Sequence, residues 1–193
     1  MATTEQFITV VSGLPRSGTS LMMQMLVAGG IPPLTDGIRQ PDADNPRGYF
    51  EFERVKQLKH DKAWLADATG KVVKIVHLLL TELPPDHNYR VVFMRRHIDE
   101  ILASQQKMLQ RSGRTRPAGN AGLLAKNFIA QVSQVQQWLS ARPNFRMLEV
   151  WHHDLIAHPQ EQVARINTFL GGALNETSMI TAIDPALHRN RSI

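Results

Sequence analysis

A stretch near the start of the sequence, SGLPRSGTSL (residues 12–21), combines glycine, hydroxyl side chains and one arginine. Its Gly13 and Gly18 have four residues between them, and apolar runs stand before and after the stretch. That order predicts a strand, a tight loop and a helix, whose backbone N–H groups converge on an anion. The hydroxyl groups of Thr19 and Ser20 can donate to a phosphate at the same place. Since glycine loops are common, an ordinary strand-to-helix turn is the alternative.

The position of the cation in this loop decides which phosphate chemistry it suits. In loops that transfer phosphoryl groups, a lysine follows the second glycine and a Ser or Thr holds Mg²⁺. Here Thr19 takes the place of that lysine, and the cation is moved back to Arg16, between Pro15 and Ser17. The strand expected at 89–94 ends in two arginines instead of a carboxylate that could hold a metal. The sequence therefore predicts a nucleotide phosphate bound without a divalent ion, and it disfavours a kinase or NTPase.

The rest of the chain supplies the elements that must position this loop. Short runs rich in β-branched and other apolar residues alternate with segments of helical periodicity, which predicts a parallel sheet with helices on both faces. We expect one three-layer α/β/α domain over residues 1–193, with the loop in a P-loop-type strand–loop–helix unit. Two irregular segments rich in Gly, Pro and charge, 32–48 and 112–122, are candidate lids or substrate loops. The expected strands are 7–11, 72–76, 89–94 and 146–150, and the expected helices are 21–28, 98–111, 123–139 and 159–170.

Composition narrows the classes of function. The formal net charge of +5 fits an anionic ligand, whereas the basic residues are too scattered to predict nucleic-acid binding. The absence of cysteine excludes disulfides, thiolate metal sites and cysteine nucleophiles. No apolar run is long enough to span a membrane, and a cytoplasmic location is the simplest expectation. The sequence gives no indication of the oligomeric state.

Together with the loop, further motifs in the sequence resemble those of a known family. GLPRSGTSL looks like the sulfate-donor loop of the sulfotransferases that use 3′-phosphoadenosine 5′-phosphosulfate (PAPS), and VVFMRRHIDEILASQ is similar to their second motif. In that motif a strand ends in an arginine and a serine follows eight residues later, as Arg96 and Ser104 do here. The segments VVKIVHLLLTELP and NPRGYFE also resemble bacterial members, so the likeness spans nearly the whole chain.

The resemblance implies a reaction and assigns roles. A sulfuryl group passes from PAPS to the hydroxyl or amine of a small or carrier-bound acceptor, and fixed cations make a metal unnecessary. Thr19 and Ser20 would bind the 5′-phosphate, and Arg96 with Ser104 the 3′-phosphate. Arg16, with Lys74 beside it, would stabilise the charge that develops on the leaving oxygen.

The general base has two candidates. His77 is the first, because imidazole titrates near neutral pH and because its distance from Leu83-Pro84 is like that of the family's histidine. Lys74 stands three residues before it, whereas the family's lysine commonly stands two before, which leaves the role of Lys74 open. Glu51 is the rival base. Without a catalytic role, His77 would be an ordinary histidine at the end of a strand, and Glu51 a solvated acid at the start of a helix.

The chain also departs from the family. The late basic segment RKGxxGxWK, which closes over the 3′-phosphate in cytosolic members, is absent, and Arg189 with Arg191 or Arg114 with Arg116 are the candidates to replace it. That departure keeps a non-catalytic nucleotide- or phosphate-binding protein on the same scaffold as an alternative to the enzyme. Adjacent His152 and His153, expected at a strand end, would point to opposite faces and are not expected to share a metal. We expect the three methionines of the first helix and the tryptophans to pack in the core.

Overall fold

Four parallel strands form the centre of the molecule. The structure, a computed structural model, describes residues 6–42, 45, 48–111, 113 and 121–183. The strands lie in the order β2-β1-β3-β4, and both β1 and β3 are flanked by parallel partners. Their bounds are β1 Ile8–Gly13, β2 Val72–Lys74, β3 Tyr89–Arg95 and β4 Phe145–Trp151. Because the strands are parallel, their carboxyl ends share one edge, which is where α/β proteins bind ligands.

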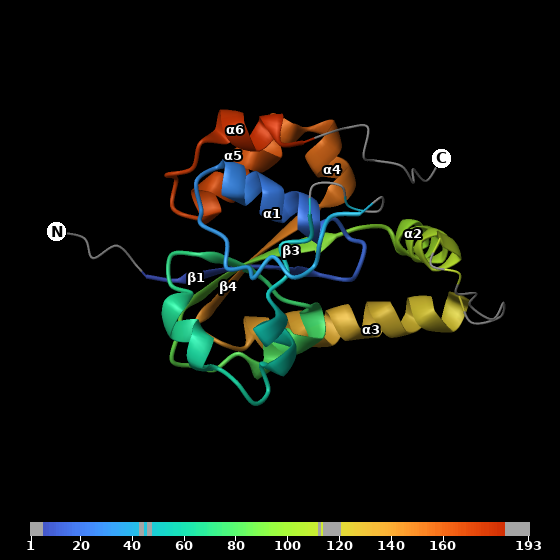
Figure 1. Cartoon of the computed structure of the whole chain (residues 1–193), viewed down its shortest axis with the longest axis horizontal. Helices are drawn as coiled ribbons and strands as arrows, with labels where there is room; N and C mark the ends of the chain where they lie inside the picture. Colours follow the sequence, from blue (N-terminus) through green and yellow to red (C-terminus); the bar gives the residue numbers. More distant parts are fainter. Residues whose placement is uncertain (1–5, 43–44, 46–47, 112, 114–120, 184–193) are drawn as a thin grey trace.

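Helices cover both faces of this sheet, which confirms the predicted three-layer α/β/α architecture (Figure 1). One face carries α1, α4, α5 and α6, and the other carries α3 with the short 3₁₀ helices η1, η2 and η3. Helix α2 follows β3 and packs beside α3. The bounds are α1 Thr19–Ala28, η1 Glu53–Gln57, η2 Ala63–Asp67, η3 His77–Glu82, α2 Ile98–Arg111, α3 Ala121–Ser140, α4 His152–Ala157, α5 Pro159–Phe169 and α6 Glu176–Thr181.

Side-chain alternation divides the core into two layers. Val91 and Phe93 of β3 lie in the cluster on the α3 side, whereas Val92 and Met94 lie in the cluster on the α1 side. All four are buried, as expected for a parallel strand covered on both faces. The three methionines of α1 are fully buried in the second cluster, and Trp64 packs edge-on against Phe52 in the first, as predicted.

Three local features differ from the expectation. The strand expected at 72–76 ends at Lys74, and η3 begins at His77. Helix α4 begins directly after β4, so His152 and His153 are helical residues and the strand-alternation argument for them is wrong. The 3₁₀ helices and α6 were not predicted, because elements of five or six residues are too short to show a helical period.

The remaining expectations concern longer segments of the chain. In the described part of the chain, none of the helices has the length and apolar character that a membrane crossing needs. Helix α2 has the predicted bounds, and α5 begins with Pro159 in its first turn as predicted. The irregular segment 112–122 lies mostly outside the described residues.

Candidate functional site

The loop after β1 leaves the N-terminus of α1 open to a ligand. Gly18 is the N-cap residue with φ 101°, and Arg16 also has a positive φ of 73°. Among the described residues, no side chain caps α1 and no acidic residue lies in its first turn. The first N–H groups of the helix therefore keep their capacity to bind an anion, with the positive end of the helix dipole behind them.

Two glycines of this loop are required by close packing as well as by backbone conformation. A Cβ on Gly13, whose φ is 147°, would lie 2.6 Å from the carbonyl oxygen of Met94 at the end of β3. A Cβ on Gly18 would lie 2.7 Å from Cδ2 of His152. The loop is thus held directly against the carboxyl end of β3 and the start of α4.

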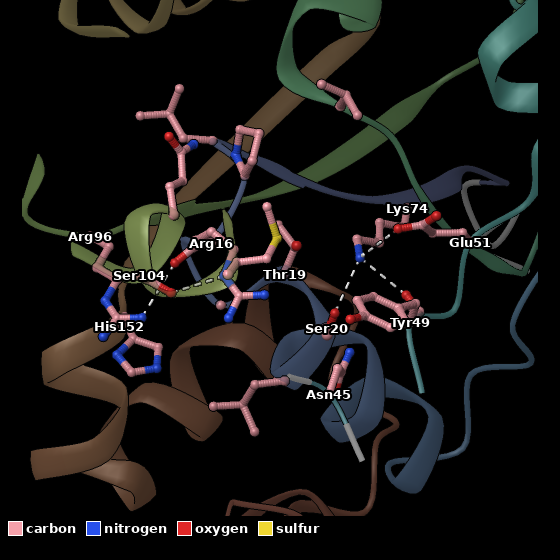
Figure 2. A pocket seen from close by; sticks show the side chains of 18 of the residues that line it. Arg16, Thr19, Ser20, Asn45, Tyr49, Glu51, Lys74, Arg96, Ser104 and His152 are labelled. Carbon is pink, nitrogen blue, oxygen red and sulfur yellow. Dashed lines mark hydrogen bonds and ion pairs between the residues drawn. The ribbon is translucent and has the colours of Figure 1, made fainter. Parts of the chain in front are cut away.

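Arg16, Arg96 and Ser104 meet on the other side of the loop (Figure 2). Arg16 Nε donates to Ser104 Oγ at 2.9 Å, and Arg96 Nη1 donates to the carbonyl oxygen of Arg16 at 3.3 Å. The Arg96 side chain, 10% exposed, also donates from Nε to Glu100 Oε2 at 2.7 Å. Glu100 lies in the first turn of α2, four residues after Arg96, so this ion pair fixes the arginine at the wall of the cavity. The sequence predicted the arginine and the serine but not the carboxylate.

Lys74 connects the loop to a second part of the site. Its Nζ donates to Ser20 Oγ and to the carbonyl oxygen of Tyr49, both at 3.1 Å, and lies 3.8 Å from Glu51 Oε1. Burial lowers the pKa of the Lys74 ammonium to about 8, and the nearby Glu51 carboxylate acts in the opposite direction. The Lys74 ammonium therefore loses its proton at a lower pH than an exposed lysine does.

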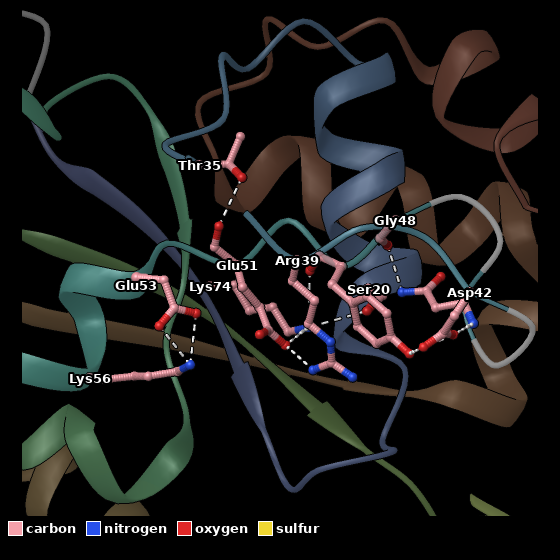
Figure 3. A network of polar contacts seen from close by, with 11 residues as sticks. Ser20, Thr35, Arg39, Asp42, Gly48, Glu51, Glu53, Lys56 and Lys74 are labelled. Carbon is pink, nitrogen blue, oxygen red and sulfur yellow. Dashed lines mark hydrogen bonds and ion pairs between the residues drawn. The ribbon is translucent and has the colours of Figure 1, made fainter. Parts of the chain in front are cut away.

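The segment from Thr35 to Glu53 is held over Lys74 by its own polar contacts (Figure 3). Thr35 Oγ1 donates to the carbonyl oxygen of Glu51 at 2.8 Å, and the Glu53 N–H donates to Asp36 Oδ2 at 2.6 Å. This backbone hydrogen bond is the main reason why the pKa of Asp36 is lowered. These two contacts tie the backbone of Glu51 and Glu53 to Thr35 and Asp36, and Glu51 lies beside Lys74.

In the same segment, the guanidinium of Arg39 stacks on the ring of Tyr49. Arg39 Nη1 lies 2.7 Å from Glu51 Oε1, and its guanidinium carbon is 3.4 Å from the centre of the Tyr49 ring. The Tyr49 hydroxyl donates to Asp42 at 2.8 Å, and burial together with this carboxylate raises the pKa of the phenol. Arg39 is thus oriented by an ion pair and by a ring that is itself anchored.

One cavity of about 530 Å³, a size that holds a small-molecule ligand, is lined by cations and polar groups from these parts, among them Arg16, Arg39, Tyr49, Glu51, Lys74, Arg96 and Ser104. The cavity runs along the carboxyl edge of the sheet, from Lys74 and Glu51 at one end to Arg96 and Ser104 at the other. Nearly all the predicted site residues line it, namely Pro15, Arg16, Gly18, Thr19, Ser20, Glu51, Lys74, Arg96 and Ser104.

Two predicted residues, Ser17 and His77, do not line this cavity. Ser17 belongs to the loop but is fully buried, with its Oγ close to Gly13. His77 is 2% exposed, and its Nε2 lies 3.2 Å from Oε1 of Gln131 on α3. Burial lowers the pKa of the imidazole below its usual value. In this geometry the His77 side chain lies against α3, outside the lining of the cavity.

Backbone alternation explains where His77 lies. Lys74, Ile75 and Val76 all border the cavity, but the Ile75 side chain is buried in the core on the α3 side, whereas Val76 is 47% exposed. Because successive residues of an extended chain point in opposite directions, the residue after Val76 turns toward α3. The spacing of three between Lys74 and His77 therefore puts the two side chains on different sides of the chain.

The cavity also contains residues that sequence reasoning did not assign. Arg39, Asn45 and Tyr49 come from the segment over Lys74, and His152 comes from the start of α4. The motif NPRGYFE was the available signal for Tyr49, whereas His152 was considered only as a metal ligand. Lys107 and Arg111 of α2 line the same cavity. The alternatives Arg114, Arg116, Arg189 and Arg191 lie outside the described residues.

Comparisons with known proteins agree with this geometry. A sequence profile of the sulfotransferase family matches residues 42–176 of the 193. The chain belongs to the sulfotransferase family. The matched range contains Glu51, Lys74, Arg96 and Ser104 but begins after the phosphate loop, so the loop is an independent observation.

Solved structures of sulfotransferase domains share the fold. The sulfotransferase domain of the Synechococcus PCC 7002 olefin synthase aligns with a TM-score of 0.59 and 17% identity, covering 98% of this chain and 88% of that domain. The sulfotransferase domain from the curacin biosynthetic pathway aligns with a TM-score of 0.54 and 16% identity, covering 92% and 78%. Among curated proteins, none matches this chain in sequence.

The buried Lys74 gives the folded protein a measurable dependence on pH. Its pKa is about 8 in the folded state and 10.5 in the unfolded chain, so between these values the unfolded chain holds more protons on this group. We expect the free energy of unfolding of the wild type to rise with pH across this window relative to Lys74→Met. The total change is about 3 kcal/mol, from about 1.4 kcal/mol per pKa unit.

Urea unfolding of both proteins at several pH values measures this difference, and the other titrating groups cancel in the subtraction. A difference that stays constant from pH 8 to 10.5 would show that Lys74 keeps an ordinary pKa and is not buried as described.

Proposed function

We propose that this protein transfers a sulfuryl group from PAPS to a hydroxyl or amine acceptor, with fixed cations in place of a metal ion. The observation that carries the proposal is the pair of anion sites in one cavity. One is the open N-terminus of α1 with Thr19 and Ser20, and the other is formed by Arg96 and Ser104. Membership of the sulfotransferase family supports a transferase, and the two sites support a donor that carries two separate phosphates.

The two phosphates of the donor would be held by different kinds of group. The N–H groups at the start of α1 and the hydroxyls of Thr19 and Ser20 suit the 5′-phosphate. Arg96 is a planar guanidinium fixed by Glu100, and Ser104 adds a hydroxyl donor, which suits the 3′-phosphate. Arg16 lies between the two sites because it already bonds Ser104 and belongs to the loop.

The donor supplies an activated sulfuryl group, whose S–O bond to the phosphate breaks as a new bond forms from sulfur to the acceptor oxygen or nitrogen. The electron pair of the broken bond stays on the phosphate oxygen, so cations near that oxygen lower the barrier. We assign this task to Arg16, which belongs to the loop, and to Lys74, which bonds Ser20 at the loop. A bound anion favours the protonated form of Lys74, which counteracts the effect of its burial.

The proton of the acceptor needs a base inside the cavity. Glu51 is the carboxylate among the described lining residues, and it lies beside Lys74 at the end of the cavity away from Arg96. His77 is buried against Gln131 instead. We therefore assign the base to Glu51, the second of the two candidates from the sequence.

Donor affinity tests the two-phosphate arrangement. We expect the desulfated donor, 3′-phosphoadenosine 5′-phosphate (PAP), to bind the wild type without magnesium in titration calorimetry. Arg96→Ala should weaken this binding by about 2–5 kcal/mol, because one partner of a desolvated charge pair is lost. The neighbouring Arg95, which pairs with Glu149 and does not line the cavity, gives the matched control, and Arg95→Ala should leave the affinity unchanged.

The double variant Arg96→Ala/Glu100→Gln removes the charge of the partner carboxylate as well and should show the same loss. An affinity that Arg96→Ala leaves intact would contradict the assignment. Tighter binding of ATP with Mg²⁺ than of PAP would point to phosphoryl transfer instead.

Turnover separates the two candidate bases and also the enzyme from a non-catalytic binding protein. We expect Glu51→Gln to lower the transfer rate from labelled PAPS by about 10²–10⁴, the range for loss of a general base. His77→Gln should retain most of the activity, and both variants should bind PAP like the wild type. Loss of activity in His77→Gln with retention in Glu51→Gln would return the role to His77, and binding of PAP without any turnover would favour the non-catalytic alternative.

A further inference from the structure

Arg39 is an oriented cation of the cavity that the donor does not require. It lies at the Glu51 end, whereas the residues proposed for the two phosphates lie along the loop and at the Arg96 end. Its ion pair with Glu51 uses Nη1, and the guanidinium also interacts with the Tyr49 hydroxyl, so within the described part of the chain some of its five N–H donors remain for a ligand. The side chain is 42% exposed, so a ligand in the cavity can reach it.

The surroundings of Arg39 hold it in one orientation. Its guanidinium stacks on the Tyr49 ring at 3.4 Å, and this ring is 5% exposed and anchored through its hydroxyl to Asp42. The backbone on either side is fixed by the hydrogen bonds of Thr35 and Asp36 described above. A guanidinium that is already fixed loses little entropy when it binds a planar or tetrahedral oxyanion, which favours specific recognition.

The excess of positive charge in the cavity also favours an anionic ligand in addition to the donor. Among the described lining residues six are lysine or arginine, and Glu51 is the acidic one. The donor accounts for Arg16, Lys74 and Arg96 in the proposed function. Arg39 stands next to the base, at the place where an acceptor hydroxyl must approach Glu51.

We propose that Arg39, stacked on Tyr49, binds an oxyanion carried by the acceptor itself. The acceptor class is then a hydroxylated anion, with a carboxylate or phosphate a few bonds from the hydroxyl that receives the sulfuryl group. The short distance of 2.7 Å between Arg39 and Glu51 sets this spacing, because the anion and the reacting hydroxyl must contact neighbouring groups. This inference rests on the proposed function.

Matched acceptors test the inference. The probes are pairs that differ in the anionic group, namely glycerol 3-phosphate with glycerol, glucose 6-phosphate with glucose, and 3-hydroxybutyrate with 2-butanol. Transfer from labelled PAPS gives kcat/KM for each, and calorimetry gives binding of each to the complex with PAP. We expect at least one anionic member to exceed its neutral partner by tenfold or more, which is about 1.4 kcal/mol.

Arg39→Gln should reduce this preference at least about tenfold, the scale of a hydrogen bond to a charged group, and leave the affinity for PAP and PAPS unchanged. Lys56→Gln is the matched control, because Lys56 is an exposed cation of the same region that pairs with Glu53 and does not line the cavity. It should leave the preference as in the wild type.

Each other outcome overturns the inference. Neutral acceptors that bind and react as well as the anionic ones, or a preference that survives in Arg39→Gln, show that Arg39 does not recognise the acceptor. A loss of affinity for PAPS but not for PAP assigns Arg39 to the sulfuryl group of the donor. Failure of the wild type to bind PAP at all would instead defeat the proposed function.

Discussion

The contact between the β1 loop and the junction of β3 with α2 is the constraint on which the site depends. Arg16 reaches Ser104 from one side, and Arg96 reaches the carbonyl oxygen of Arg16 from the other. These residues are far apart in sequence, and parallel pairing of β1 with β3 brings them to the same edge. Without that contact, the open N-terminus of α1 and the arginine at the end of β3 would be two weak anion sites. With it they become one cavity with two fixed anchors.

Much of this arrangement could be predicted, because it follows from where the loop and the arginine stand relative to the strands in the sequence. A loop after β1 and an arginine at the end of β3 must share the carboxyl edge of a parallel sheet. The strands and longer helices were also predictable, since buried strands and helices of several turns show clear periodicity. The short elements were not, and one of them, η3, changes the site. Where β2 stops and η3 begins decides the direction of His77, and a few residues of sequence do not fix that boundary.

The motif NPRGYFE marked part of the segment over Lys74, but the shape of this segment could not be derived from the sequence. Its shape depends on single polar contacts, such as Thr35 with the backbone of Glu51 and Asp36 with the backbone of Glu53, which have no periodic pattern. The result is a lysine, a carboxylate and a stacked guanidinium within one polar network. Burial keeps the pKa of Lys74 near 8, so the charge of this end of the cavity depends on its surroundings. The other end, by contrast, contains a permanent cation, Arg96, beside the backbone N–H groups of the loop.

The most direct test of the account is a crystal structure of the protein with PAP bound. We predict that the 5′-phosphate lies on the N–H groups at the start of α1, within hydrogen-bonding distance of Thr19 and Ser20. The 3′-phosphate should contact Arg96 and Ser104, with Arg16 between the two. A nucleotide bound outside this cavity, or one whose 3′-phosphate faces solvent while Arg96 contacts only Glu100, would contradict the central claim.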